Sequence, residues 1–388
     1  MRNLKKIDIA KPFLSVDEWR AIKKPIQNGW VTQGKMVTDF ESSFSNFHKT
    51  PYALATTSCT TALHLGLIAL GVKPGDEVIV PSFTWISTAN VVEYCGAKPI
   101  FADVDPSTFN LDFDDVKKKL TKKTKVIIPV HLFGLCCDII KLREIIPKNV
   151  KILEDAACAS GSKFFNNFAG NIGDAATFSF HPRKIITTGE GGMLSTKSKK
   201  IYDEICKLRN MGASISDAQR HFGPTPYILP EFKILGYNYR MTDIQAAIGI
   251  SQMKKLKIII SRRKEMAAFY SESLSNIDWL ILPKTPKNFS HAWQAYVTIV
   301  DPKKAPAKRN TIMETLEKKG ISTRPGTQAV HMLGYYKKKY NIKSNDLPKS
   351  KFCYQNSMAI PLHNNLSLKD LKYVVKCIKN LDSKKNKI

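Results

Sequence analysis

KILEDAACASGSKFFNNFAGNIGDAATFSFHPRKIITTGEGGMLST, residues 151–196, is the stretch that decides the fold. Ile152 and Leu153 end a short apolar run that predicts a strand, and Glu154 and Asp155 follow at its end. Residues 175–180 are small, apolar or aromatic and predict a second strand, which ends with Ser179 and Phe180 before a proline. Lys184 follows on a loop, with a glycine cluster close behind that allows tight turns.

Asp155 and Lys184 are the residues in this stretch that suggest chemistry. In an open α/β sheet the carboxyl ends of the strands face the ligand crevice, where a carboxylate can keep a ring nitrogen protonated. A neutral lysine amine forms Schiff bases with carbonyl compounds such as pyridoxal phosphate (PLP). Each residue alone has a plainer interpretation, because a loop lysine is usually a solvated charge and an aspartate can cap a helix.

Strands and helices alternate on both sides of this stretch, which predicts an α/β fold with a mainly parallel central sheet and helices on both faces. From about residue 261 the pattern changes to a smaller α+β region. We therefore predict a large domain with an N-terminal arm over 1–260 and a small C-terminal domain over 261–388. The predicted strands before residue 154 are Tyr52–Ala55, Glu77–Pro81, Pro99–Val104, Lys125–Val130 and Lys151–Leu153, and the predicted helices between them include Phe113–Leu120 and Asp138–Ile146.

Local signals place several other elements. Ser15 with Glu18, and Thr242 with Gln245, have the spacing of capping boxes at helix starts. Residues 201–211, 303–319 and 366–381 have helical patterns, while 291–300 and 321–324 are strand-like. The segment 212–230 is predicted to be a long polar loop, and such loops are usually functional. His131 follows a strand, and we interpret it as a satisfied core residue rather than a catalytic one.

The chain carries a net charge of +27, so nucleic-acid binding has to be considered. Its lysines are spread along the chain, and no helix-turn-helix, zinc-finger, RRM or KH pattern is present. We expect no nucleic-acid partner, and attraction of an anionic substrate is a modest benefit of the charge. The eight cysteines have no metal-ligand spacing, so we expect reduced thiols and no metal. No apolar run is long enough to span a bilayer and the start lacks a signal-peptide pattern, so we expect a cytoplasmic protein without membrane contact.

Hydroxyl residues precede a helical pattern after the first predicted strand. In TTSCTTAL, residues 56–63, they stand at a helix start, where free N–H groups and the helix dipole bind a phosphate. Ser58, Cys59 and Thr60 are therefore candidate phosphate contacts. Simple N-capping by Ser58 is the alternative interpretation, and it is compatible with the first.

Taken together, the motifs EDAACASGS (154–162), GDAATFSFHPRK (173–184), ITTGEGGM (186–193) and GYNYRMTD (236–243) resemble the DegT/DnrJ/EryC1/StrS family of PLP-dependent sugar aminotransferases. Within it the chain is most similar to the perosamine synthase type, which aminates C4 of nucleotide-linked 4-keto-6-deoxy sugars. The resemblance extends from AKPF (10–13) to IPLH (360–363). It implies fold type I, the aspartate-aminotransferase-like fold, and a homodimer with a shared active site.

The resemblance also implies roles for individual residues. Lys184 and Asp155 are the expected catalytic residues, and Trp85 is expected to lie flat against the cofactor ring, although a buried core Trp is its plainer interpretation. Asn238 is expected to reach the phosphate of the partner subunit, with an Asx-turn as the alternative. The expected cofactor-binding residues are Ser58, Cys59, Thr60, Trp85, Asp155, Cys158, Ser179, Lys184 and Asn238. The expected substrate-binding residues are Trp30, Thr32, His181, Glu190, Arg240, Arg324 and His331, of which the last two have a surface position as their alternative.

In this reading PLP alternates with pyridoxamine phosphate while an amino group passes from a donor, expected to be glutamate, to a keto sugar for surface polysaccharide. The chain departs from the family pattern in two places. Cys59 stands where many relatives have glycine, and Cys158 where many have a glutamine or histidine that contacts the cofactor's phenolic oxygen. The presence of Lys184 favours amination over the family's dehydratase branch, which lacks it. Amination at C3 or of a cyclitol, a carbon–sulfur lyase and a binding protein without turnover remain open.

Overall fold

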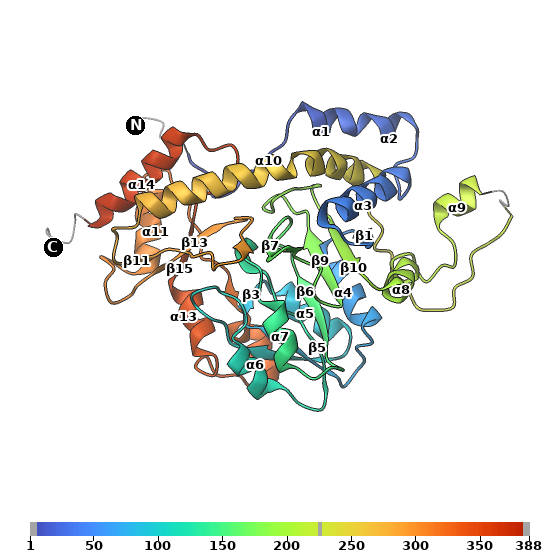
Figure 1. Cartoon of the computed structure of the whole chain (residues 1–388), viewed down its shortest axis with the longest axis horizontal. Helices are drawn as coiled ribbons and strands as arrows, with labels where there is room; N and C mark the ends of the chain where they lie inside the picture. The colour runs from blue at the N-terminus through green and yellow to red at the C-terminus, as the bar shows by residue number, and fades with distance from the viewer. Residues whose placement is uncertain (1–5, 224–226, 383–388) are drawn as a thin grey trace.

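The computed structural model describes residues 6–223 and 227–382 (Figure 1). Its centre is a seven-stranded sheet of strand order β1-β10-β9-β6-β5-β2-β4. All its neighbouring pairs are parallel except the two made by β10. In sheet order the strands are β1 (Tyr52–Thr56), β10 (Gly192–Thr196), β9 (Ala175–Ser179), β6 (Lys151–Asp155), β5 (Thr124–Ile127), β2 (Glu77–Pro81) and β4 (Lys98–Ala102). The predicted α/β fold with a mainly parallel sheet is confirmed.

Helices cover both faces of this sheet, which explains why its strands are apolar without alternation. Leu153 belongs to a buried cluster with α4 and α5, whereas its neighbour Ile152 packs on the opposite face with α6 and α7. Nearer β1, a third cluster packs α3 and α10 against the sheet. These helices are α3 (Lys35–His48), α4 (Cys59–Ala69), α5 (Ser87–Tyr94), α6 (Phe113–Lys119), α7 (Ile139–Ile145), α8 (Lys199–Arg209) and α10 (Asp243–Ser273).

The C-terminal part of the chain builds a three-stranded sheet of order β11-β13-β15, with its own buried cluster. The strands are β11 (Leu280–Ile281), β13 (Tyr296–Val300) and β15 (Ser357–Ile360), and the nearby helices are α11 (Arg309–Glu317), α12 (Gly334–Tyr340), α13 (Pro348–Asn356) and α14 (Leu368–Asp382). Figure 1 shows α10 running along the top from the large sheet to this part. Helix α10 has 31 residues and passes through residue 260 without a break, and the division of the chain there stays a prediction.

Short elements complete the fold. They are α1 (Val16–Ala21), α2 (Lys23–Gln27), β3 (Phe83–Thr84), η1 (Leu132–Gly134), β7 (Lys163–Phe164), β8 (Asn167–Phe168), α9 (Asp217–Phe222), β12 (Phe289–Ser290), β14 (Gln328–Ala329) and η2 (Val330–Met332). The pair β3 and β14 matters for the site, because it ties residues 83–84 to the C-terminal part of the chain. Both predicted capping boxes are present, at the starts of α1 and α10.

Four sequence predictions need correction. Glu154 and Asp155 are the last residues of β6 rather than its sequel. The predicted loop 212–230 contains α9, while residues 224–226 of it lie outside the described part. The run 291–300 becomes a strand only from Tyr296, because Trp293 has a φ of 55° that interrupts an extended chain. Residues 321–324 make isolated bridges rather than an edge strand.

Candidate active site

Asp155 ends β6 at the carboxyl edge of the parallel strands, with 4% of its surface exposed. Its carboxylate accepts two hydrogen bonds, from the Thr88 hydroxyl to Oδ2 at 2.9 Å and from the Ala157 N–H to Oδ1 at 3.2 Å. Burial raises its pKa above the ordinary value, although these donors and the Lys184 amine act in the opposite direction. The fold therefore holds a buried carboxylate that a cationic partner would stabilise.

Glu154, the preceding residue, makes hydrogen bonds that stabilise the surrounding fold instead. Its carboxylate accepts from His131 Nε2 at 2.7 Å and from the N–H groups of Gly170 at 2.8 Å and Ile172 at 2.9 Å. Burial raises its pKa, but the hydrogen bonds from His131 and the backbone outweigh burial and lower it. His131 is fully buried and also accepts from the Cys137 N–H, which confirms it as a satisfied core residue.

Lys184 lies on the loop after β9, and its amine donates to Cys158 Sγ at 3.2 Å. The residue is half-buried as a whole, but its amine is enclosed near Cys158, Cys59 and Asp155. Burial lowers the pKa of this amine, and the acidic groups around it outweigh burial and raise it. Asp155 and Lys184 are thus electrostatic neighbours, as the sequence motif suggested.

The N-terminus of α4 reaches the same place. Ser58 caps the helix by accepting from the Thr61 N–H at 3.2 Å, and Cys59 Sγ lies 3.6 Å from the Thr177 hydroxyl. Thr177 is the β9 residue paired with Asp155, so the helix start meets the end of β6. Burial raises the pKa of the Cys59 thiol, and the nearby Asp155 charge adds to the effect, so this thiol stays neutral. The first turn of α4 keeps the N–H groups that bind phosphate in other proteins.

Gly192, the first residue of β10, allows this close approach. A Cβ at this position would lie 2.3 Å from the Ser58 carbonyl carbon and 2.5 Å from the Cys59 nitrogen, and both are backbone atoms. We expect Gly192→Ala to push the start of α4 away, to destabilise the protein by about 1–3 kcal/mol, and to weaken PLP binding. Thermal unfolding and cofactor titration measure both.

Gly334→Ala is the matched control for this change. A Cβ there meets no atom within 4 Å, so both quantities should stay at wild-type values. Wild-type cofactor affinity in Gly192→Ala would contradict a role for the α4 start in phosphate binding.

Trp85 lies between β3 and α5, with 62% of its surface exposed. The alternative of a buried core tryptophan is therefore wrong, and the indole face is available to a planar ring. Ser179 ends β9 and is buried, and its Oγ accepts from the His181 N–H at 3.4 Å. Asn238 is exposed and forms a backbone bridge with Asn210, so its side chain is displayed on the surface.

The expected substrate contacts lie on several different segments. Thr32 and Glu190 are exposed, while Trp30 is half-buried and donates from Nε1 to the Gln33 carbonyl. His181 is half-buried, and burial lowers its pKa. The Arg240 guanidinium donates to Asn210 Oδ1 at 2.8 Å, and Arg324 is an exposed residue beside β15. Their contacts with a substrate stay predictions.

His331 does not fit the role that the sequence suggested. It is fully buried, with Nδ1 hydrogen-bonded to the Ser82 hydroxyl and Nε2 to the Ser344 carbonyl. Both ring nitrogens are therefore occupied inside the protein, and no side-chain atom remains to meet a substrate. Its alternative, a surface position, is equally wrong, because η2 turns the ring into the core.

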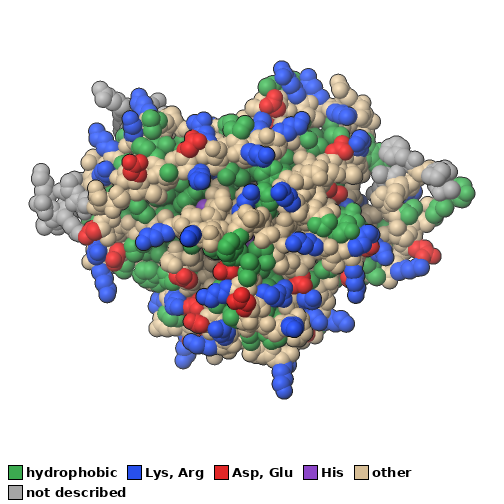
Figure 2. Space-filling model, viewed as in Figure 1, with side chains coloured by type: hydrophobic (Ala, Val, Ile, Leu, Met, Phe, Trp, Pro, Cys, Tyr) green, Lys and Arg blue, Asp and Glu red, His purple; other side chains and the backbone are tan. Residues whose placement is uncertain are grey.

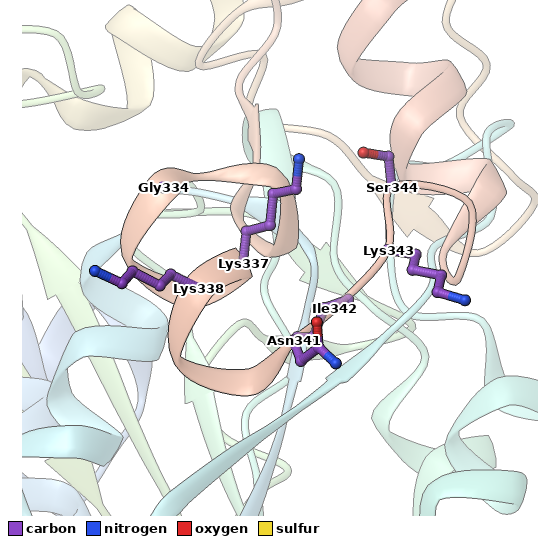
Figure 3. A pocket seen from close by; sticks show the side chains of 7 residues that line it. All are labelled: Gly334, Lys337, Lys338, Asn341, Ile342, Lys343 and Ser344. Carbon is purple, nitrogen blue, oxygen red and sulfur yellow. The ribbon is translucent and has the colours of Figure 1, made fainter.

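A separate hollow of about 430 Å³ lies beside α12 (Figure 3). It is lined by Gly334, Lys337, Lys338, Asn341, Ile342, Lys343 and Ser344. In Figure 3 the Lys338 and Lys343 side chains point away from each other, so their charges do not converge. None of the expected catalytic or cofactor-binding residues lines this hollow, and the site described above remains the candidate.

The charge is distributed as the sequence suggested. Figure 2 shows lysines and arginines scattered over the visible face with acidic side chains between them, rather than gathered in one patch. Within residues 6–223 and 227–382, no helix is both long and apolar enough to cross a bilayer. In the same residues, no cluster of His, Cys, Asp and Glu has the make-up of a metal site.

The chemistry of the donor set fits PLP. The site offers a buried carboxylate for the pyridinium nitrogen, an enclosed lysine amine for the aldehyde and an exposed indole for the ring. The start of α4 offers N–H groups for the phosphate. The carboxylate in particular is a buried acid whose pKa stays above the ordinary value, although Lys184 and His131 both favour its charged form.

Comparison with known proteins agrees with this chemistry. Residues 13–379 match the model of the DegT/DnrJ/EryC1/StrS aminotransferase family. The chain is 35% identical to the GDP-perosamine synthase of Caulobacter vibrioides, over 97% of this chain and 98% of that protein. It is also 35% identical to the spore coat polysaccharide biosynthesis protein SpsC of Bacillus subtilis, over 95% of each.

Among solved structures, Spr1654 from Streptococcus pneumoniae, described as a sugar aminotransferase, superposes with a TM-score of 0.91 at 29% identity in its PMP form. The match covers 98% of this chain and all of that one. The same protein is known in a PLP form, with a TM-score of 0.90. The similarity in sequence and in structure therefore extends over nearly the whole chain.

Proposed function

Because the chain belongs to the DegT/DnrJ/EryC1/StrS aminotransferase family, we propose that it is a PLP-dependent enzyme that transfers an amino group from glutamate to the C4 ketone of a nucleotide-linked 4-keto-6-deoxyhexose. The product would enter surface polysaccharide. The observation that carries the proposal is the buried Asp155 carboxylate close enough to interact electrostatically with the Lys184 amine, which donates to Cys158 three residues after Asp155. The perosamine synthase relatives support the sugar and its position, and SpsC supports the pathway class.

When bound, PLP supplies an aldehyde for the amine and a cationic ring that draws negative charge from the donor's α-carbon. Asp155 would keep the ring nitrogen protonated by its opposite charge. Its two protein donors, the Thr88 hydroxyl and the Ala157 N–H, would hold the carboxylate in place for this role.

Lys184 moves the proton that the transfer needs. With PLP bound, its amine would be the base that accepts the proton of the donor's α-carbon and the acid that returns a proton. Because its pKa is raised in the protein alone, the amine is mainly protonated at neutral pH and must lose this proton before it attacks an aldehyde. Cys158 accepts a hydrogen bond from the amine. With PLP bound it would stand beside the ring, at the position where many relatives have a stronger donor.

We place the phosphate at the start of α4, with Ser179 and with Asn238 of the partner subunit. Two observations support a homodimer: Asn238 is exposed, and the segment after residue 226 displays large apolar side chains that a monomer would leave in water. These side chains are Tyr227, Ile228, Leu229, Phe232, Ile234 and Leu235. Light scattering of the purified protein tests this assembly.

The proposed reaction predicts a defined product pattern. Purified protein loaded with PLP and given glutamate should aminate a nucleotide-linked 4-keto-6-deoxyhexose and release 2-ketoglutarate in equal amounts. The assay is mass detection of the amino sugar over a panel that varies the nucleotide (GDP, UDP, dTDP) and places the ketone at C3 or C4, with aspartate and glutamine as other donors. NMR of the product locates the new amine.

The alternatives give different results in the same panel. Amination of only the 3-keto sugars or of a cyclitol would replace the C4 proposal. Binding of the sugar nucleotides without product or keto acid would replace the enzymatic one. Release of ammonia or sulfide without an amino sugar would indicate a lyase.

A further inference from the structure

Thr88 lies in the first turn of α5 and contacts both sides of the candidate site. Its hydroxyl donates to Asp155 Oδ2 at 2.9 Å, across 67 residues of sequence. Its main-chain N–H donates to the Trp85 carbonyl at 3.2 Å. The side chain is fully buried, so neither contact competes with water. One residue thus joins the carboxylate expected at one edge of the cofactor ring to the main chain of Trp85, whose indole is expected on the face of the ring.

A neighbouring hydroxyl extends the connection. The Thr84 and Thr88 hydroxyls lie 3.3 Å apart, and Thr88 gives its proton to Asp155, so Thr84 is the donor between them. Hydrogen bonds in such a chain strengthen one another in a dry interior. Thr84 is also the β3 residue that pairs with Gln328 of β14, which anchors this chain to the C-terminal part of the protein.

From these contacts we propose that Thr88 is a positioning residue whose hydroxyl fixes the Asp155 carboxylate beside the cofactor ring, on the same turn that carries Trp85. The inference rests on the proposed function, because it assigns those two residues to the ring. A methyl group of the same shape could fill the space of the hydroxyl but could not donate to the carboxylate. The hydroxyl is therefore the feature to test, and the bulk of the side chain is the feature to hold constant.

Thr88→Val makes that change and leaves the main-chain bond to Trp85 in place. Because hydrogen bonds to charged groups are the strong ones, we expect PLP affinity to fall by about tenfold to a hundredfold. Loss of a donor also favours the protonated form of the Asp155 carboxyl. When the absorbance of the bound cofactor is followed against pH, its acid limb should therefore move to higher pH by about half a unit or more. The kcat should fall with it, while KM for the sugar changes less than about threefold.

Two further variants separate positioning from stability. Thr88→Ser keeps the hydroxyl. Its PLP affinity should be within about twofold of wild type, and its acid limb within about 0.2 pH unit of wild type. Thr298→Val removes another fully buried hydroxyl, which donates to the Met358 carbonyl at 2.9 Å in the small sheet. It should lower thermal stability without moving either cofactor measurement. If Thr88→Val does not fold, Thr88→Ala removes the same hydroxyl without added bulk and replaces it.

Wild-type affinity and an unshifted acid limb in Thr88→Val or Thr88→Ala would overturn the inference and leave the proposed function standing. Failure of Thr88→Ser to restore them would also overturn it, because the shape of threonine rather than its hydroxyl would then matter. A wild-type protein that binds no PLP would overturn the proposed function and this inference together.

Discussion

Lys184→Ala should reduce amino transfer by at least about 10,000-fold, because one substitution removes both the amine that attaches the cofactor and the group that moves the proton. The cofactor should still bind through its phosphate and ring, but borohydride should no longer fix it to the protein. Turnover with the best sugar of the panel and mass spectrometry after reduction measure the two effects.

Two variants show whether the effect belongs to this amine. Lys184→Arg keeps a positive charge near Asp155 but lacks the nucleophile, so it should be as inactive as the alanine variant. Lys200→Ala removes an exposed lysine of the following helix and should keep wild-type turnover and trapping. Residual transamination by Lys184→Ala above about one thousandth of wild type would end the proposal that this residue carries the chemistry.

Asp155→Asn should have the second largest effect, a loss of on the order of a hundredfold to a thousandfold in kcat. The amide has the shape of the carboxylate but no charge, so it cannot hold a cationic ring nitrogen. Since Lys184 is untouched, borohydride should still fix the cofactor to the protein, which distinguishes this variant from Lys184→Ala. Turnover and the absorbance of the bound cofactor measure the two consequences.

The same substitution should change how stability depends on pH. Burial raises the pKa of Asp155, so the folded protein holds a proton that the unfolded chain gives up near its ordinary value of 3.8. The cofactor-free protein therefore loses stability as pH rises from that value through the raised pKa, and the loss persists at neutral pH. Asp155→Asn does not titrate, so its unfolding temperature without PLP should fall less than that of wild type as pH rises above 3.8.

Asp174 provides a control in which the pH dependence of stability has the opposite sign. Burial raises its pKa, but the Ile152 N–H, Arg143 and Lys151 outweigh burial and lower it. A lowered pKa contributes stability above the unfolded value, and that stability disappears as pH falls through the folded pKa. Asp174→Asn should thus lower stability at neutral pH and leave the cofactor measurements unchanged. If the unfolding temperatures of wild type and Asp155→Asn change with pH in the same way, the assignment of a buried, destabilising charge to Asp155 is contradicted.

Local patterns in the sequence were enough to predict much of this architecture. Capping boxes and apolar runs depend on residues a few positions apart, so the starts of α1 and α10 and most strands of the large sheet could be predicted without a partner in space. Predictions failed where the local signal was interrupted or did not match the structure that formed. The positive φ at Trp293 ended a run that looked like a strand, and α9 formed inside a segment whose composition favoured a loop.

The sequence alone could not predict whether a given side chain is buried or exposed. Trp85 and His331 had both been assigned to ligand contacts, with a core position as the alternative for Trp85 and a surface position for His331. The structure exposes Trp85 and buries His331 with both nitrogens paired. The sequence around each residue is apolar enough for either outcome, because the decision depends on which distant segment covers it.

The sequence by itself determined the class of fold and the motif that holds Asp155 and Lys184, since both depend on residues close together in the chain. Only the tertiary structure decided that Thr88 donates to Asp155, that Cys59 meets Thr177 and that Gly192 lies against the start of α4. These contacts join segments far apart in sequence. They arise from the order of the strands, which is set by how all the helices and strands bury their apolar faces together.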